Sequence, residues 1–476
     1  MFVLLIFLPL LAALIHMDST VATWLMLTSQ VALLLNQTVR GQVTGTGSFI
    51  FLSLLFFGIR PIYIVTENDF DLFHRLFFID VDLLAVNQNM LWATLAMIVF
   101  WLGSASNDPR KQRIAESEEN ASENTPVPHA ATNGMARIFL LFQIISLPFM
   151  IYLAGSGRAL YSSSFGAYAY DLPVPLQSIH IIAILVILER YLDRREAAHF
   201  GSLILSSLLF LAFTWYMREV SMFRGFYIGG VMIAGIAAIM RLRGRVSYLW
   251  LILPILLVQP FFRSLGETRS LSNIEIQELS ILEKSFGDEK PTNAYWRFYD
   301  SKGDMNIFDT FVAARASAPE TTPYILSWLY APVHIIPRAI WSSKPERGVL
   351  HDVSFTNGAP YSPGIAGFFW LDGGNDYWLL ASMFGLGMII GRLDRKVLNM
   401  REGYLRNALL AILVVNCMFL TRFFLWQAFW QTLYAVTPCF LLHYLLAPRN
   451  QELTAGQSDN DLKKRPLSVD TKAPAR

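Results

Sequence analysis

The sequence predicts an all-helical membrane protein that crosses the bilayer about twelve times, with one large segment outside the membrane. Of its 476 residues, 54% are hydrophobic and only 16% are charged, whereas an ordinary soluble domain carries about 25% charged residues. The charges gather between apolar stretches that are long enough to cross a hydrocarbon layer about 30 Å thick. The net charge of +2 is too small to indicate a nucleic-acid partner.

The apolar stretches predict the spans one by one. The first stretch lacks the basic leading region and the cleavage site of a secretory signal, and a second follows almost at once, so we interpret it as a transmembrane helix. Cys417 and Cys439 both lie within apolar stretches and are predicted to be small buried hydrophobes rather than disulfide partners or metal ligands. The predicted spans are 1–16, 20–36, 47–65, 84–103, 136–154, 176–192, 200–216, 225–240, 247–262, 376–392, 407–421 and 426–446.

Lys and Arg in the connections predict the orientation of these spans, because translocation across a membrane selects against them. The basic residues of alternate connections all fall on one side if both termini are cytoplasmic. They are Arg110, Lys111, Arg113, Arg190, Arg194, Arg195, Arg241, Arg243, Arg245, Arg392, Arg395, Lys396, Arg401, Arg406, Lys463, Lys464 and Arg465. We therefore expect nine helices within residues 1–262, three within 376–446, and cytoplasmic termini.

Three segments are predicted to lie outside the membrane. Residues 104–135 and 447–476 are polar and have too little apolar surface to fold, so we expect them to be disordered on the cytoplasmic side. Residues 263–375 form a long connection on the outer side that is not low in complexity. A connection of this length is a candidate functional element.

Amphipathic helices are predicted within this outer segment. Phe308, Phe311 and Val312 share one helical face, and Arg315 lies near the end of the same helix. The stretch 324–341 is apolar but broken by prolines, so we expect it to lie in the membrane interface rather than to cross.

Cationic residues are also predicted on the outer side, where the positive-inside bias depletes them. They are Arg158, Arg218, Arg224, Arg263, Arg269, Arg297, Arg315, Arg338, Lys344, Arg347 and Arg422. A guanidinium group is a planar, permanently charged fork that suits phosphate oxygens, so convergent arginines at this level indicate an anionic headgroup. For any one arginine, snorkelling to lipid phosphates or pairing with Glu219, Asp309 or Glu320 is the favoured interpretation. For the group, anion binding is favoured.

No phosphate loop, dinucleotide fingerprint, zinc-ligand spacing or nucleophile elbow occurs in the sequence. A different pattern runs from Asn-Ile-Phe-Asp at 306–309 to Pro-Arg-x-x-Trp-x-x-Lys-Pro at 337–345. It continues through 362–368 into a glycine-rich helix at 385–391, and an Arg-Gly pair at 224–225 opens an earlier helix. Together these elements resemble the signature of the Wzy-type O-antigen and oligosaccharide repeat-unit polymerases.

The resemblance is strongest over roughly residues 215–395, and segment 264–304 matches nothing in the family pattern. It implies a metal-independent, GT-C-like membrane glycosyltransferase of the hexosyltransferase type, without a cofactor, in a bacterial inner membrane. Such enzymes polymerise oligosaccharide repeat units linked to undecaprenyl diphosphate into O-antigen or exopolysaccharide at the periplasmic face. The resemblance also implies contact with membrane lipid and a chain-length regulator protein as a partner.

The chemistry of such a reaction assigns roles to the outer cations. A departing diphosphate carries a large negative charge, and fixed cations aimed at it stabilise the transition state. Arg224, Arg338 and Lys344 are the first candidates for diphosphate binding. Arg218, Arg315 and Arg422 are the second candidates.

The acceptor hydroxyl must lose a proton, so a general base is also sought on the outer side. Glu219 and His351 are the candidates for this catalytic role, with Glu267, Asp372 and Asp376 on the same side. Glu219 is equally a structural partner of the adjacent Arg218, and a histidine in a loop is more often a polar surface residue.

Two other functions stay open. An O-antigen ligase uses the same donor but transfers the glycan to a lipid A core, and the motif at 337–345 favours the polymerase over it. A lipid-linked sugar transporter or flippase would carry ionisable residues near the middle of the bilayer. Mid-helix positions are predicted to be nearly free of charge while the cations collect at one face, and this favours a one-sided enzyme.

Overall fold

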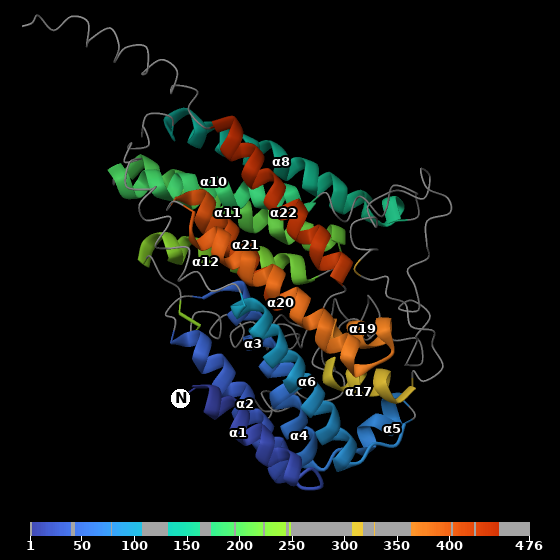
Figure 1. The fold of residues 1–476 in the computed structure, drawn as a ribbon. Helices are drawn as coiled ribbons and strands as arrows, with labels where there is room; N and C mark the ends of the chain where they lie inside the picture. The colour runs from blue at the N-terminus through green and yellow to red at the C-terminus, as the bar shows by residue number, and fades with distance from the viewer. Residues whose placement is uncertain are drawn as a thin grey trace, which may run out of the picture.

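The computed structural model describes residues 2–39, 43–77, 79–106, 132–161, 173–194, 197–221, 224–243, 247–248, 307–317, 328, 363–400, 403–422 and 425–446. The elements within these ranges are all helical (Figure 1). They are α1 (Phe2–Ile15), α2 (Thr20–Thr38), α3 (Gly45–Leu54), the π-helix η1 (Leu55–Ile59), α4 (Arg60–Glu67), α5 (Asp71–Phe77), α6 (Leu83–Ala105), α8 (Thr132–Tyr161), α10 (Pro173–Arg194), α11 (Ala197–Ser221), α12 (Arg224–Arg243), α17 (Ile307–Ser317), α19 (Gly364–Gly373), α20 (Asp376–Leu398), α21 (Tyr404–Leu420) and α22 (Leu425–Leu446).

The described chain is a helical membrane protein, as the sequence predicts. Within its described ranges, four helical segments are long and apolar enough to cross a bilayer, and several shorter helices are also apolar. The four segments are Gly45–Glu67, Leu83–Ala105, Val174–Leu192 and Ala198–Tyr216. The predicted spans overlap described helices except 247–262, of which only the first two residues are described, and the number of twelve crossings stays a prediction.

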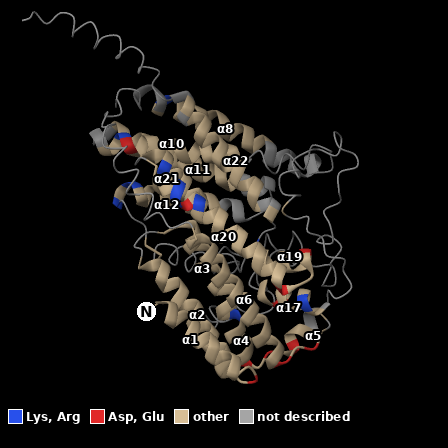
Figure 2. Ribbon diagram, in the orientation of Figure 1, with Lys and Arg blue, Asp and Glu red and all other residues tan. Residues whose placement is uncertain are grey.

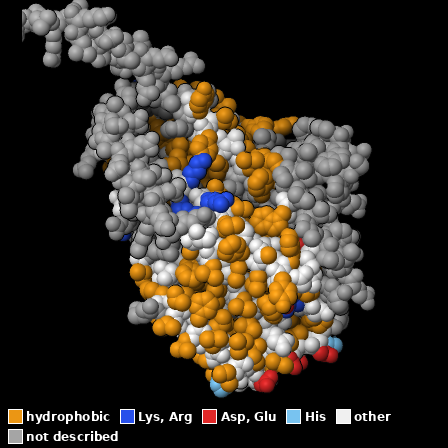
Figure 3. Space-filling model, in the orientation of Figure 1, with side chains coloured by type: hydrophobic (Ala, Val, Ile, Leu, Met, Phe, Trp, Pro, Cys, Tyr) orange, Lys and Arg blue, Asp and Glu red, His pale blue; other side chains and the backbone are white. Residues whose placement is uncertain are grey.

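The described surface agrees with a lipid environment. Hydrophobic side chains cover much of the face shown in Figure 3. Helix α1, for example, exposes Leu4, Leu8, Leu11 and Ile15. Figure 2 shows that charged residues are sparse along the helices and lie mostly near helix ends. Large apolar side chains on the outside are costly in water but not in hydrocarbon.

The helices form two groups, which lie in the lower and upper halves of Figure 1. Helices α1 to α6 share one hydrophobic core with α17, α19 and α20, and helices α8 to α12 share a second core with α21 and α22. Helices α3 and α21 contribute side chains to both cores and pack against each other. Cys417 and Cys439 are both buried, which confirms their predicted burial.

Local sequence fixes where several helices begin. Thr44 caps α3 by accepting a hydrogen bond from the backbone N–H of Gly47 at 3.1 Å. Asp82 caps α6 in the same way, through the N–H of Ala85 at 2.8 Å. Such caps satisfy the N–H groups that a first helical turn leaves without partners.

Helices α6 and α20 pack along a seam of glycines. A Cβ atom at Gly387 would collide with the carbonyl oxygen of Phe100, one at Gly391 with that of Ser104, and one at Gly103 with that of Phe384. Small residues spaced four apart allow two membrane helices to approach until their backbones touch. The glycine-rich helix noted in the sequence therefore has a packing role.

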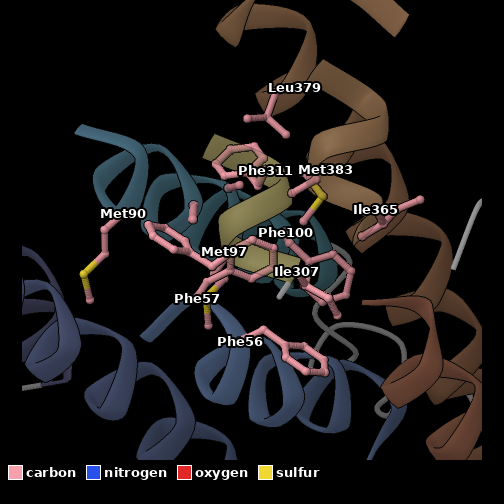
Figure 4. Close-up of a cluster of buried hydrophobic side chains, with 14 of the residues drawn as sticks. Phe56, Phe57, Met90, Met97, Phe100, Ile307, Phe311, Ile365, Leu379 and Met383 are labelled. Carbon is pink, nitrogen blue, oxygen red and sulfur yellow. The ribbon is translucent and has the colours of Figure 1, made fainter. Parts of the chain in front are cut away.

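The predicted outer segment contributes two buried helices. Every side chain of α17 from Ile307 to Ala314 is buried, and so is all of α19. The sequence predicts a helix with one apolar face here, but α17 is enclosed on all sides by η1, α5, α6 and α19. Figure 4 shows Ile307 and Phe311 among side chains of the surrounding helices. Part of the predicted outer segment is thus built into the helical bundle.

The glycine seam generates the first prediction. Gly387→Ala should lower the free energy of unfolding by about 1–3 kcal/mol, because a methyl group forces α6 away from α20. Gly235→Ala is the matched control, since a Cβ atom there meets nothing within 4 Å, and it should be neutral or stabilising by up to about 1 kcal/mol. Unfolding in detergent micelles measures both. Equal effects of the two substitutions would contradict the close packing at Gly387.

Candidate anion-binding site

The corner between α19 and α20 brings Trp370 close to Asp376. Gly374 ends α19 in the left-handed conformation, with φ of 64°, and its N–H donates to the carbonyl of Trp370 at 2.7 Å. Asn375 then caps α20 by accepting from the N–H of Trp378 at 2.8 Å. Glycine is favoured at this turn because a left-handed residue with a Cβ atom is strained.

Arg315, on the last turn of α17, meets this corner. Its Nη2 atom lies 2.9 Å from Oδ1 and 3.1 Å from Oδ2 of Asp376. The centre of its guanidinium group lies 5.5 Å from the ring of Trp92, 5.6 Å from that of Phe311 and 5.7 Å from that of Trp370. Four helices, α6, α17, α19 and α20, therefore supply one cation and its aromatic surroundings.

One nitrogen of this guanidinium group is unsatisfied. Nη1 of Arg315 is buried and has no hydrogen-bond partner among the described residues, although the side chain as a whole is 16% exposed. Burial lowers the pKa of Arg315, and the charge of Asp376 opposes this shift; a guanidinium group nevertheless stays protonated in proteins. A buried donor without an acceptor costs about 1–3 kcal/mol. The Nη1 group can therefore donate a hydrogen bond to an oxygen atom of a ligand, and it favours an oxygen that carries negative charge.

A second arginine lies deeper in the bundle. Arg60 begins α4, directly after η1, and its Nε donates to Oδ1 and Oδ2 of Asp309 at 3.1 and 3.2 Å. Its Nη2 atom lies 2.6 Å from Oδ2 of the same carboxylate, and both side chains are 0% exposed. Its guanidinium group also lies 5.4 Å from the ring of Tyr63. This pair attaches the start of α17 to the third predicted span.

Arg60 corrects the sequence analysis. It lies inside the predicted span 47–65, so the expectation that mid-helix positions are nearly free of charge is wrong at this position. Asp309 does pair with an arginine, as the structural interpretation of the outer cations allows, but that arginine is Arg60. A single charge between residues 45 and 66 was the signal in the sequence, because an ionisable residue inside a membrane helix marks a functional site by default.

The other predicted site residues are described in part. Arg218 and Glu219 lie on the last turns of α11 and Arg224 opens α12, but their side chains fall outside the described part of the structure. Arg422 follows α21, and its neighbour Thr421 accepts a hydrogen bond from the N–H of Ile365 at the start of α19. Of the cations predicted to bind diphosphate, Arg315 is therefore the one with a described surrounding of rings and carboxylate. Three predicted site residues lie outside the described residues, namely Arg338, Lys344 and His351.

Of the three carboxylates named as further bases, Glu267 lies outside the described residues and the other two are described. Asp376 forms the ion pair with Arg315, and Asp372 is buried on α19. Across the ranges that the structure describes, no group of three or more His, Cys, Asp or Glu residues is arranged to hold a metal ion. The described chemistry of this site consists of a guanidinium group, a carboxylate and aromatic rings.

Helix α20 separates this site from the cations predicted on the cytoplasmic side. Asp376 is its first residue, whereas Arg392, Arg395 and Lys396 lie in its last turns. Near that end, Nη1 of Arg395 donates to the carbonyl of Ser104 at 3.0 Å. Arg315 of α17 thus lies against one end of α20, and the predicted cytoplasmic cations lie near the other end.

Comparisons with known proteins found no matching family model, no similar curated protein and no similar solved structure. The function is therefore inferred from the residues and their geometry.

The two Arg–Asp pairs should differ in their effect on stability. Arg60→Gln leaves Asp309 buried without its partner and should lower the free energy of unfolding by about 3–5 kcal/mol. Asp376→Asn affects a pair that is 16% and 24% exposed, so the loss should be smaller, about 1–2 kcal/mol. Unfolding in micelles compares them. If the two substitutions cost the same, the difference in burial between the pairs has no energetic consequence.

Proposed function

We propose that this protein is a glycosyltransferase that polymerises oligosaccharide repeat units carried on undecaprenyl diphosphate, as the Wzy-type resemblance implies. The observation that carries the proposal is the environment of Arg315, with a buried Nη1 donor that has no partner within the described chain and with Trp92, Phe311 and Trp370 around it. A lipid-linked sugar diphosphate offers phosphate oxygens for the donor and sugar rings for the aromatic faces.

Transition-state stabilisation supports this assignment. When the glycosidic bond to the diphosphate breaks, negative charge develops on the departing phosphate oxygen. A guanidinium group held in advance by Asp376 and by aromatic rings needs no reorganisation at that moment. The same surroundings leave only 16% of the Arg315 side chain exposed, and this partial burial strengthens the attraction between the guanidinium group and the phosphate.

Arg315 alone does not supply enough charge. Asp376 neutralises part of it, so a diphosphate with several negative oxygens needs further cations. We assign this role to Arg224, Arg338 and Lys344, with Arg218 and Arg422 as additional candidates, as the sequence resemblance implies. Glu219 and His351 are the proposed general bases for the acceptor hydroxyl.

The membrane arrangement follows from the same proposal. We infer about twelve spans, a GT-C-like fold, cytoplasmic termini and a bacterial inner membrane, with residues 263–375 on the periplasmic side. The positions of Asp376 and Arg395 near opposite ends of α20 support this orientation. The lipid tail would lie between helices, so that the diphosphate meets Arg315 at the level of the membrane surface. A chain-length regulator is the proposed protein partner.

A lipid-linked sugar flippase is the second candidate, because a buried ion pair that involves a membrane helix is a feature of transporters. Arg60 and Asp309 form such a pair. Both side chains are 0% exposed, however, whereas the charges of a transport pathway line a cavity that the substrate reaches. The glycosyltransferase therefore fits the described residues better.

Complementation of a strain that lacks its own polymerase tests the proposal. The wild-type chain should restore a ladder of lipopolysaccharide or exopolysaccharide chain lengths on a gel. Arg315→Ala should reduce the ladder to single repeats, because removal of one preorganised donor lowers a rate by about 10²–10³. Arg315→Lys should give a weak ladder, since it keeps the charge but not the planar fork.

Arg243→Ala is the matched control, because Arg243 lies in the last turn of α12, among the cations predicted to be cytoplasmic. Its ladder should equal that of the wild type, and each variant must reach the membrane in equal amount. An unchanged ladder with Arg315→Ala would contradict the site. No ladder with the wild type, in its native host, would favour the ligase or the flippase.

A further inference from the structure

Burial of the Arg60 side chain costs free energy, so its position needs an explanation other than stability. It is fully buried in an otherwise apolar segment, and its Nη1 atom has no hydrogen-bond partner among the described side chains and backbone groups. A buried ion pair contributes little net stability compared with apolar residues of the same size, whereas loss of one partner is strongly destabilising. Such a pair is therefore better suited to fixing one arrangement of two helices than to stabilising the fold.

The backbone around Arg60 is also specialised. The π-helix η1 ends immediately before it, and Pro61 follows it. Pro61 has no N–H to donate to the carbonyl of Phe57, four residues earlier. Gln30 of α2 supplies a replacement, because its Nε2 donates to that carbonyl at 3.2 Å and to Oγ1 of Thr94 at 2.8 Å. A π-helix inserts an extra residue into a turn and changes the direction of the side chains that follow.

Both η1 and Arg60 contact the same helix of the outer segment. The ring of Phe57 packs edge-on against Phe308 and Phe311, at 6.4 and 5.7 Å between ring centres. Asp309, which receives Arg60, lies between them in the sequence, and Arg315 lies six residues further along α17. Six residues of an α-helix span about 9 Å. Any shift or rotation of Asp309 therefore moves Arg315.

We propose that Arg60 is a positioning residue, which holds α17 through Asp309 so that Arg315 meets Trp92, Trp370 and Asp376. Its ion pair sets the position and rotation of α17 in the bundle, and η1 aims the Arg60 side chain at that helix. Through this contact Arg60 sets the affinity of Arg315 for a phosphate-bearing lipid. The ligand part of this inference rests on the proposed function, whereas the docking of α17 does not.

Cysteine labelling tests the docking without reference to activity. Ala314 is 0% exposed on α17, so Ala314→Cys should react slowly with a maleimide in the otherwise wild-type chain. The chain without this cysteine gives the background from Cys417 and Cys439, which are both buried. In Arg60→Gln, labelling of Cys at position 314 should accelerate about a hundredfold, because the buried carboxylate loses its partner and drives α17 out.

Four further variants keep the test decisive. Asp309→Asn should have the same effect as Arg60→Gln, and the double variant should label no faster than either single one, because both remove one interaction. Arg60→Lys keeps the positive charge and should restore most of the protection. It replaces Arg60→Gln in the labelling test if Arg60→Gln does not fold. Thr23→Val is the matched control. It removes a hydrogen bond of 2.7 Å from Thr23 of α2 to Asn87 of α6, and both side chains are as fully buried as Arg60 and Asp309.

The ligand is represented by farnesyl diphosphate, with farnesol as the uncharged comparison. Its affinity for the detergent-solubilised protein should fall about tenfold in Arg60→Gln, as expected for one lost charge-assisted hydrogen bond, and stay unchanged in Thr23→Val. The positioning role is overturned if position 314 stays protected in Arg60→Gln. It is also overturned if Thr23→Val accelerates labelling as much as Arg60→Gln does. Lost protection with unchanged farnesyl diphosphate affinity keeps the positioning role and overturns the proposed diphosphate site.

Discussion

A charged group inside an apolar helix must find an opposite charge, and in this protein Arg60 finds Asp309, 249 positions away in the sequence. The requirement links the candidate span Gly45–Glu67 to α17, a short helix of the predicted outer segment. Once Asp309 is fixed, the apolar side chains of α17 fill the space beside η1 and α6, and Arg315 meets its aromatic neighbours. Electrostatics decides which helix docks there, and hydrophobic contact supplies most of the free energy.

Helix α20 makes a polar contact near each of its ends, through Asp376 and Asp394. Asp376 in its first turn pairs with Arg315. Asp394 near its last turn accepts hydrogen bonds from the N–H groups of Gly45 and Thr46, at 2.7 and 2.9 Å, and so caps α3. A carboxylate at a helix N-terminus is favoured by the helix dipole and by the N–H groups without partners there. Between these ends the glycine seam holds α20 against α6, so the Arg315 site rests on a rigid support.

Hydrophobic runs predicted most of the helices, because a membrane span is a property of a contiguous segment. Burial of α17 could not be predicted in this way, since it depends on η1 and α19, which lie far away in the sequence. Averaging over an apolar stretch does not single out Arg60, because one charge hardly changes the average, although its isolation is visible in the sequence. Arg315 was found from its predicted side of the membrane and its residue type, but its partner Asp376 depends on the corner after α19. Arg338, Lys344 and His351 stay predictions from the resemblance.

We propose that α17, docked through Arg60, presents Arg315 to the phosphate of a lipid-linked ligand. A cryo-electron microscopy map of the protein in nanodiscs with bound farnesyl diphosphate tests it most directly. We expect phosphate density within hydrogen-bond distance of Nη1 of Arg315, between Trp92 and Trp370, with the Arg60–Asp309 pair intact. Phosphate density elsewhere, with Nη1 of Arg315 contacting only protein atoms, would contradict the account.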